Sequence, residues 1–254
     1  MEIFNRFFDP DGSFETLSRF GHILSGITWI GLLYFFNFVQ TPAYTKLSDA
    51  ARSEALRAVT WRALWWFRWA AVATVVFGLL IISVQEMDPD APGGNYWSGV
   101  TGTAILTGIL FGLTMFLNVW GVIWRAQKVV IGSAEAVAAG GAANPDAPAA
   151  AKRGARASRA NTFFSFTMLW FMVFAAHGPG FWGAEGEQVG GTVVYWIFVL
   201  ILWAVVEASA LGVIGGLDNA INKNLFDDHR RTILFGFVYL LVIYLIGWEL
   251  LLPA

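Results

Sequence analysis

Two of the three histidines lie in apolar segments, where their chemistry would be unusual. His22 lies in "RFGHILSGITWIGLLYFFNF" (residues 19–38), and His177 lies in "FMVFAAHGPGFWG". Neutral imidazole is the commonest metal-binding side chain and a frequent axial ligand of haem iron. The residue type and its apolar setting therefore point to haem chemistry, provided that the fold brings the two rings together.

The residues around the two histidines have matching spacings. Trp29 follows His22 by seven residues, and Trp170 precedes His177 by seven residues. Seven residues is about two helical turns, so each tryptophan shares the face of its histidine. Gly26, one turn from His22, leaves room for a flat macrocycle. We predict a haem b site with His22 and His177 as iron ligands and with Gly26, Trp29 and Trp170 beside it. A histidine near a helix end can also bind interfacial water or a carbonyl, and this alternative stays open.

The composition places the histidines in a membrane protein. The 254 residues are 57% hydrophobic and 13% charged, which is too apolar for an ordinary soluble domain. A membrane-spanning helix needs about 20 mostly apolar residues. Six such runs are expected, and no alternating strand pattern recurs, so we predict an all-α polytopic helical bundle. The predicted spans are residues 18–39, 63–85, 99–123, 161–182, 191–215 and 231–251.

The basic residues predict the orientation of these spans. Lys and Arg occur in the loops 40–62, 124–160 and 216–230, whereas the loops 86–98 and 183–190 contain acidic residues and neither Lys nor Arg. By the positive-inside rule the first three loops are cytoplasmic and both termini are periplasmic. We therefore expect a multi-pass protein of the bacterial inner membrane, in contact with the lipid bilayer. The N-terminus lacks the features of a signal peptide.

The expected organisation has two three-helix halves. A periplasmic segment, 1–17, precedes the first half, 18–132, and the second half is 161–254. Between them, residues 133–160 include "GSAEAVAAGGAANPDAPAA", a composition that favours a flexible cytoplasmic linker. Residues 43–60 are read either as a short surface helix or as a solvated connector.

Four polar residues fall within the cytoplasmic half of the spans: Asn37, Arg68, Asn118 and Glu207. Isolated charges in a membrane are costly. We expect Arg68 to pair with Glu207 and the asparagines to bridge helices; a proton or quinone site is the alternative. His229 lies at the opposite end from the other histidines and is read as a helix cap in "DDHRR". The chain has no cysteine, which excludes thiolate metal sites, and no basic patch that predicts nucleic-acid binding.

Three segments resemble the membrane module of the PuuD-type urate oxidase family. They are "HILSGITWIG", "MFLNVWGVIWRAQKVVIG" and "RANTFFSFTMLWFMVFAAHGPGFWG". The resemblance covers residues 17–183 and extends weakly beyond. The matching residues in this chain are His22, Gly26, Trp29, Asn118, Trp120, Trp124, Gln127, Asn161, Ser165 and His177.

The resemblance implies a redox function. In that family a cytochrome c domain follows the membrane module and is thought to accept electrons from urate oxidation. This chain ends at Ala254 before such a domain, so the expected partner is a separate periplasmic cytochrome c or a membrane electron-transfer complex. We expect an integral membrane haem protein that exchanges electrons with a cytochrome or quinone, with urate oxidation as the implied reaction. The alternatives are a non-enzymatic subunit of a larger respiratory or photosynthetic complex and, with less support, a transporter.

Overall fold

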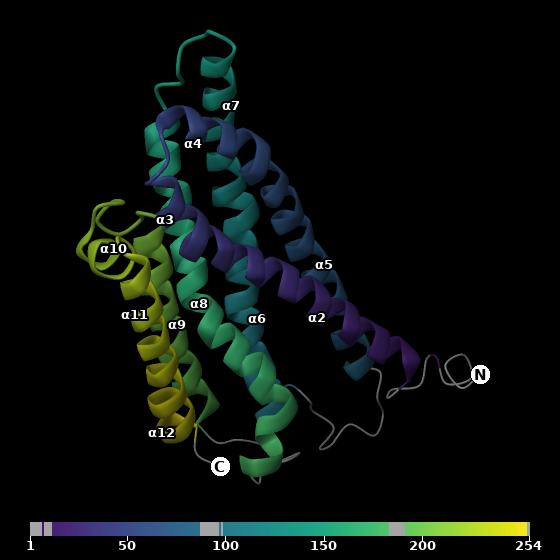
Figure 1. The fold of residues 1–254 in the computed structure, drawn as a ribbon. Helices are drawn as coiled ribbons and strands as arrows, with labels where there is room; N and C mark the ends of the chain where they lie inside the picture. Colours follow the sequence, from purple (N-terminus) through teal and green to yellow (C-terminus); the bar gives the residue numbers. More distant parts are fainter. Residues whose placement is uncertain (1–6, 8–11, 87–96, 98, 183–190, 253–254) are drawn as a thin grey trace.

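The protein is all-α, as predicted (Figure 1). The computed structural model describes residue 7, residues 12–86, residue 97, residues 99–182 and residues 191–252. Three predicted regions lie partly or wholly outside the described residues. They are residues 1–6 and 8–11 of segment 1–17, most of the loop 86–98 and the whole of the loop 183–190. The helical elements are α2 (Ser13–Tyr34), η1 (Phe35–Gln40), α3 (Thr41–Tyr44), α4 (Asp49–Ala55), η2 (Leu56–Thr60), α5 (Trp61–Glu86), α6 (Val100–Asn118), η5 (Val119–Ile123), α7 (Trp124–Ala138), α8 (Ala147–Trp182), α9 (Thr192–Ala210), α10 (Ala220–Leu225), α11 (His229–Leu241), η6 (Val242–Trp248) and α12 (Glu249–Leu251).

Five continuous helical stretches are long and apolar enough to cross a membrane, counting the described residues only. A polytopic membrane bundle is therefore consistent with the structure. Several stretches join an α-helix to a π-helical turn, as α6, η5 and α7 do. The five stretches are Ser13–Tyr44, Asp49–Val84, Val100–Ala138, Thr192–Ala210 and His229–Leu251.

The sixth predicted span, 161–182, lies in α8 but is not among these stretches. The charged and polar residues of α8 make it less apolar than the five stretches. α8 packs against α6, α7 and α11; its Asn161 hydrogen-bonds α6, and its Ser165 hydroxyl meets Tyr34 of α2. Small polar side chains are common where membrane helices touch, because they allow close approach and interhelical hydrogen bonds. The fully buried polar residues of α8 are Asn161, Thr162, Ser165 and Thr167.

The first two spans form a hairpin in which α2 packs along α5. The backbone of α2 approaches α5 closely at Gly21, where an added Cβ would lie 2.6 Å from the ring of Phe77. Farther along the hairpin, the rings of Phe36 and Phe67 meet edge to face, with centroids 5.4 Å apart. α6 belongs to the predicted first half, yet it packs on α8 of the second. Helix packing therefore crosses the predicted three-plus-three division.

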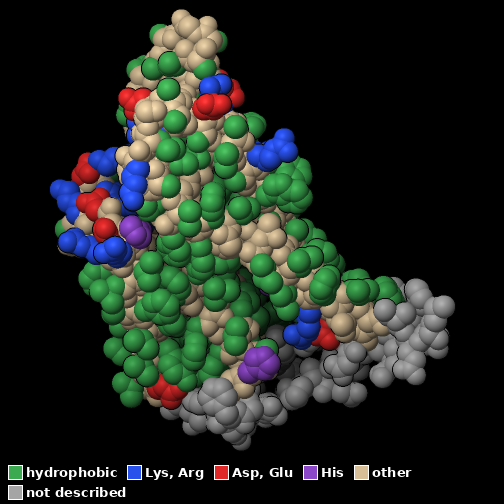
Figure 2. Space-filling model, in the orientation of Figure 1, with side chains coloured by type: hydrophobic (Ala, Val, Ile, Leu, Met, Phe, Trp, Pro, Cys, Tyr) green, Lys and Arg blue, Asp and Glu red, His purple; other side chains and the backbone are tan. Residues whose placement is uncertain are grey.

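The three predicted basic loops lie at one end of the bundle, which we call the basic end (Figure 1). It carries α4, the turn between α7 and α8, and α10. Lys and Arg side chains gather there in Figure 2, as the positive-inside reading requires. Residues 49–55 form the short surface helix α4, capped by the Ser48 hydroxyl, which accepts a hydrogen bond from the Ala51 N–H.

The predicted linker 133–160 is mostly helical. α7 continues to Ala138 and α8 begins at Ala147, so the irregular connection is 139–146. Alanine has the highest helix propensity, and Gly154 lets α8 approach α7 closely, since a Cβ added there would lie 3.0 Å from Ala126. An Ala-rich composition is compatible with tightly packed helices as well as with a flexible chain. Here most of the segment is helical and packs against its neighbours.

Candidate functional site

His22 is held by the neighbouring helix of its hairpin. Its Nδ1 lies 2.8 Å from the carbonyl oxygen of Thr74 on α5. A carbonyl only accepts hydrogen bonds, so Nδ1 carries the proton and donates it. In the neutral ring, Nε2 then has the lone pair that a metal ion requires. Carbonyl-anchored histidines of this kind are common among metal ligands, because the second hydrogen bond fixes both tautomer and ring orientation.

His22 lies deeper in its helix than predicted. The sequence placed it four residues after the start of a span at residue 18, whereas α2 begins at Ser13. His22 is therefore about 13 Å along the helix axis from its start. It is level with Thr74, near the middle of α5. A site that uses His22 therefore lies between two and three turns into α2, at a partly buried position.

His177 lies on the exposed surface of α8. The prediction that Gly178 and Pro179 end the helix is wrong, because α8 continues to Trp182. Proline usually breaks or kinks a helix, because it lacks the backbone donor and its ring clashes with the preceding turn, but the helical backbone continues past Pro179 here. His177 is thus about one turn inside α8, on the helix face that also carries Trp170.

The residues predicted beside the histidines have different surroundings. Trp29 is buried in the core, and its indole Nε1 has no hydrogen-bond partner among the described residues. Trp170 is 39% exposed, and its ring meets Tyr244 of η6 edge to face, with centroids 5.2 Å apart. Gly26 faces α5, where an added Cβ would lie 3.9 Å from the methyl group of Thr74. Trp29 and Gly26 therefore belong with His22, and Trp170 belongs with His177.

α2 and α8 touch near the basic end and diverge toward the other end (Figure 1). Where they touch, the hydroxyls of Tyr34 and Ser165 are 2.9 Å apart, and Asn37 Nδ2 donates to Ser158 Oγ at 2.8 Å. Below this contact the surface is hollowed between the hairpin and the rest of the bundle in the view of Figure 2. Joint ligation of one iron by His22 and His177 stays a prediction.

The intramembrane asparagines bridge helices, as predicted. Asn118 Nδ2 on α6 donates to Asn161 Oδ1 on α8 at 3.0 Å, and Asn161 Nδ2 donates to the Met115 carbonyl at 2.9 Å. The Asn118 side chain also lies near the Glu207 carboxyl on α9. The Oε2 atom of that carboxyl is buried without a hydrogen-bond partner among the described residues. This polar group ties α6, α8 and α9 together.

The expected Arg68–Glu207 pair does not form. Glu207 faces Asn118, whereas the Arg68 guanidinium carbon lies 3.7 Å from the ring centre of Trp124. Stacking on indole offers a guanidinium an electrostatic attraction without a carboxylate. Arg68 therefore belongs to an aromatic surface of α5, η5 and α7 and not to the polar group inside the bundle.

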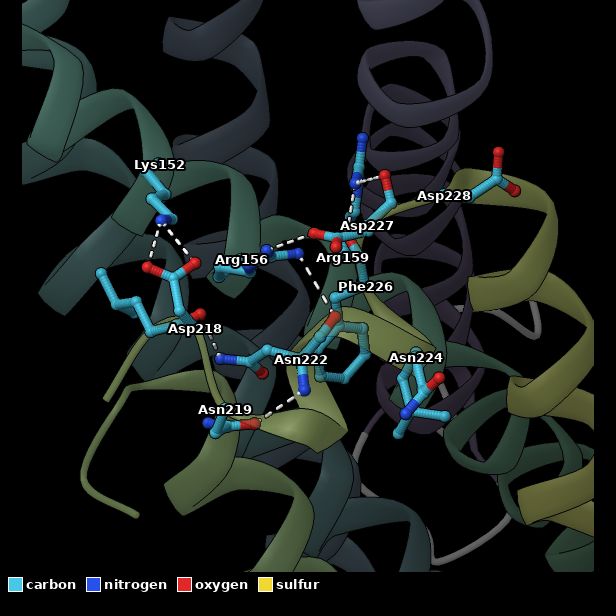
Figure 3. Close-up of polar contacts among 12 residues, drawn as sticks. Lys152, Arg156, Arg159, Asp218, Asn219, Asn222, Asn224, Phe226, Asp227 and Asp228 are labelled. Atoms are coloured by element: carbon cyan, nitrogen blue, oxygen red, sulfur yellow. Dashed lines mark hydrogen bonds and ion pairs between the residues drawn. The ribbon is translucent and has the colours of Figure 1, made fainter. Parts of the chain in front are cut away.

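A second polar cluster lies at the basic end, where α8 binds the segment between α9 and α11 (Figure 3). Lys152 Nζ donates to both carboxyl oxygens of Asp218 at 2.6 Å, and Arg156 pairs with Asp227. Arg159 donates to the backbone carbonyl of Asp227 at 2.6 Å. Arg156 is buried at 7% exposure, so this cluster is a structural clamp between α8 and the segment 211–228.

The charges in the clamp affect the pKa values of its members. The Lys152 hydrogen bond lowers the pKa of Asp218, and the backbone N–H of Arg231 lowers the pKa of Asp228. Burial lowers the pKa of Arg159. All three groups lie outside the candidate membrane-spanning stretches. The carboxylates are therefore stabilised in their charged forms, as paired and capping groups should be.

Sequence reasoning read residues 152–159 as a topology signal and missed the clamp. The available signal was the i, i+4, i+7 spacing of Lys152, Arg156 and Arg159, which puts the three cations on one helix face. The acidic pair Asp227–Asp228 gave the complementary charge. To predict that these cations and carboxylates are in contact, one would have to know that the segment 211–228 folds back on α8.

Comparisons with protein-family models, with curated proteins and with solved structures found no match. The protein is a multi-helix all-α protein with apolar helices of membrane-spanning length. Among the described residues, no group of three or more His, Asp or Glu side chains could hold a metal ion. Two histidines with a haem macrocycle would not require such a group.

Proposed function

We propose that this protein is an integral membrane haem protein that transfers electrons, with His22 and His177 as the axial ligands. One observation carries the proposal: the Thr74 carbonyl anchors His22 Nδ1 within an apolar helix pair and leaves Nε2 for a metal. Intramembrane ionisable residues are usually functional. Burial alone would not require that one nitrogen of the imidazole is held by a hydrogen bond while the other is left for a metal ion.

Small residues surround His22 where α2 packs on α5. Gly78 lies against the ring, since an added Cβ would be 3.2 Å from His22 Cε1. Gly26, one turn farther along, also faces α5. Trp29 Nε1 is a buried donor without a partner among the described residues, and an oxygen of a bound group would satisfy it. On α8, the His177 side chain is exposed and would supply the second ligand.

When bound, haem supplies reversible one-electron transfer. The chain's own residues would set the conditions for it. The hydrogen bond to Thr74 makes His22 a more basic ligand and holds the ring in place. The apolar side chains of α2 and α5 exclude water, which favours the less charged iron state.

The partner and substrate follow from the resemblance to the PuuD-type urate oxidase family. We propose that a separate periplasmic cytochrome c, or a quinone in the bilayer, exchanges electrons with the haem, in the bacterial inner membrane. Urate is the first substrate to test. Anaerobic addition of urate to the oxidised protein should produce the spectrum of the reduced form. An unchanged spectrum would remove urate but would leave haem binding standing.

Visible spectra of the purified protein, oxidised and dithionite-reduced, test haem binding. We expect haem bands in the unaltered protein and a loss of at least tenfold in bound haem in His22→Ala and His177→Ala. His229→Ala is the matched control, because His229 lies at the basic end, and its spectrum should not change.

Two results would contradict the proposal: a colourless protein after expression with added haem precursor, or full haem content in both ligand variants. A colourless chain that co-purifies with a haem-rich complex in mild detergent would instead support the accessory-subunit alternative. Size-exclusion profiles of the variants show whether the bundle has folded.

A further inference from the structure

A cation–aromatic cluster lies on α5, η5 and α7, apart from the residues of the proposed haem site. The Arg68 guanidinium carbon lies 3.7 Å from the centre of the Trp124 ring and 5.9 Å from that of Trp120. Lys128 Nζ lies 5.7 Å from the Trp124 ring. Trp61 covers Trp124 from the start of α5, with ring centroids 5.3 Å apart. Two cations therefore share one indole.

The cluster has donors without acceptors. Arg68 Nε and Nη1 and Trp120 Nε1 are buried and have no hydrogen-bond partner among the described residues. Arg57, whose segment η2 packs against α7, also has a buried Nε without a partner. None of these cations forms an ion pair with any described carboxylate. Unmet donors of charged groups are costly, so a bound anion with several oxygens would stabilise this surface.

The cluster lies next to an exposed aromatic surface toward the basic end of α5. Its members are large apolar side chains that stay about half exposed. Tryptophan is enriched at membrane–water boundaries, where the ring is apolar and the N–H is polar. An anion that binds here therefore sits at the depth of lipid headgroups. The exposed residues are Trp61, Trp65, Trp66 and Trp69.

We propose that this surface binds the phosphate of an anionic phospholipid in the leaflet at the basic end. Arg68, with Lys128 and the Trp120 N–H, would hold the headgroup phosphate, while the exposed tryptophans of α5 contact the acyl chains. Basic pockets between transmembrane helices bind lipid headgroups in this way. The guanidinium matches phosphate better than an ammonium does, because its planar donors bind two oxygens together.

Native mass spectrometry of the full-length protein, released from detergent with equal amounts of phosphatidylglycerol and phosphatidylcholine, tests the proposal. We expect retained phosphatidylglycerol to exceed phosphatidylcholine and to fall at least fivefold in Arg68→Gln. Arg68→Lys should retain an intermediate amount. Arg62→Gln, an exposed arginine of the same helix, is the matched control and should bind like the unaltered protein.

Trp120→Phe keeps an aromatic side chain but replaces the indole by a smaller phenyl ring and removes the N–H, so a smaller decrease is expected from it without loss of the fold. Equal retention of the two lipids, or unaltered retention in Arg68→Gln, would overturn the proposal. Displacement of the lipid by millimolar inorganic phosphate would also overturn it, since it would indicate a site for free anions. Thermal unfolding of each variant shows whether lower lipid retention comes from weaker binding or from a destabilised fold.

Discussion

His22 and Arg68 show how far a single residue's role depends on its contacts. Both were singled out because polar groups are rare in apolar spans. His22 donates to a backbone carbonyl on the neighbouring helix, and Arg68 stacks on an indole. Neither contact involves a charged partner. Every residue has a backbone carbonyl, so a bond to one cannot be predicted from the pattern of side chains. The sequence therefore predicts that these positions matter but not which groups they contact.

At the residue scale, we predict that Asn118→Leu destabilises the bundle. The substitution removes the donor to Asn161 Oδ1 and leaves that oxygen unsatisfied in the interior. Hydrogen bonds between membrane helices contribute about 1 kcal/mol, so a loss of about that size is expected in denaturant unfolding in detergent. The control is Asn224→Ala, whose amide bonds the Ala220 carbonyl on the exposed side of α10. Equal effects of the two substitutions would contradict the prediction.

Asp228 provides a prediction about pH. Its carboxylate accepts from the N–H groups of Arg230 and Arg231 and caps α11, which lowers its pKa in the folded protein. The resulting stabilisation is present above the unfolded pKa of about 3.9 and is lost as pH falls through the lower folded pKa. Asp228→Ala should cost about 1 kcal/mol at pH 7.

Asp228→Asn distinguishes the cap from the charge. Asparagine can still accept the backbone hydrogen bonds but does not titrate. We therefore expect near-normal stability at pH 7 and a weaker decline as pH falls below about 4, measured by thermal unfolding at each pH. An unchanged acid response in Asp228→Asn would show that other carboxylates dominate it.

At the element scale, α8 organises the bundle, and its contacts need small residues on its neighbours. On α11, Gly236 lies against α8: a Cβ there would be 2.6 Å from the Phe166 ring and 3.2 Å from the Phe163 carbonyl. A backbone atom cannot rotate away, so a larger residue would push the helices apart. This is the close approach that glycine permits between membrane helices.

We predict that Gly236→Val destabilises the protein by about 1–3 kcal/mol, through overpacking. Gly31→Ala is the control, because Gly31 has nothing within 4 Å of an added Cβ and alanine has the higher helix propensity. It should raise the midpoint of thermal unfolding slightly. A Gly236→Val protein as stable as the unaltered one would show that α11 is not packed on α8 as described.

At the scale of the whole molecule, the absence of cysteine makes the orientation directly measurable. Ala142→Cys lies in the exposed turn between α7 and α8 at the basic end, and Thr16→Cys lies on the exposed start of α2 at the other end. We expect a membrane-impermeant maleimide to label Thr16→Cys in intact spheroplasts and Ala142→Cys only after lysis. The reverse pattern would invert the orientation derived from the positive-inside rule.

The sequence determined the all-α class, the apolar helices and the gathering of the basic loops at one end. These properties follow from composition summed over about 20 residues and from local charge. Only the tertiary structure decided that α8 lies at the centre, that Arg156 binds Asp227 and that Arg68 stacks on Trp124. Lipid and protein interior are both apolar, so hydropathy cannot distinguish a helix face turned to lipid from one turned to another helix. The partners of each polar side chain are fixed only when the helices pack.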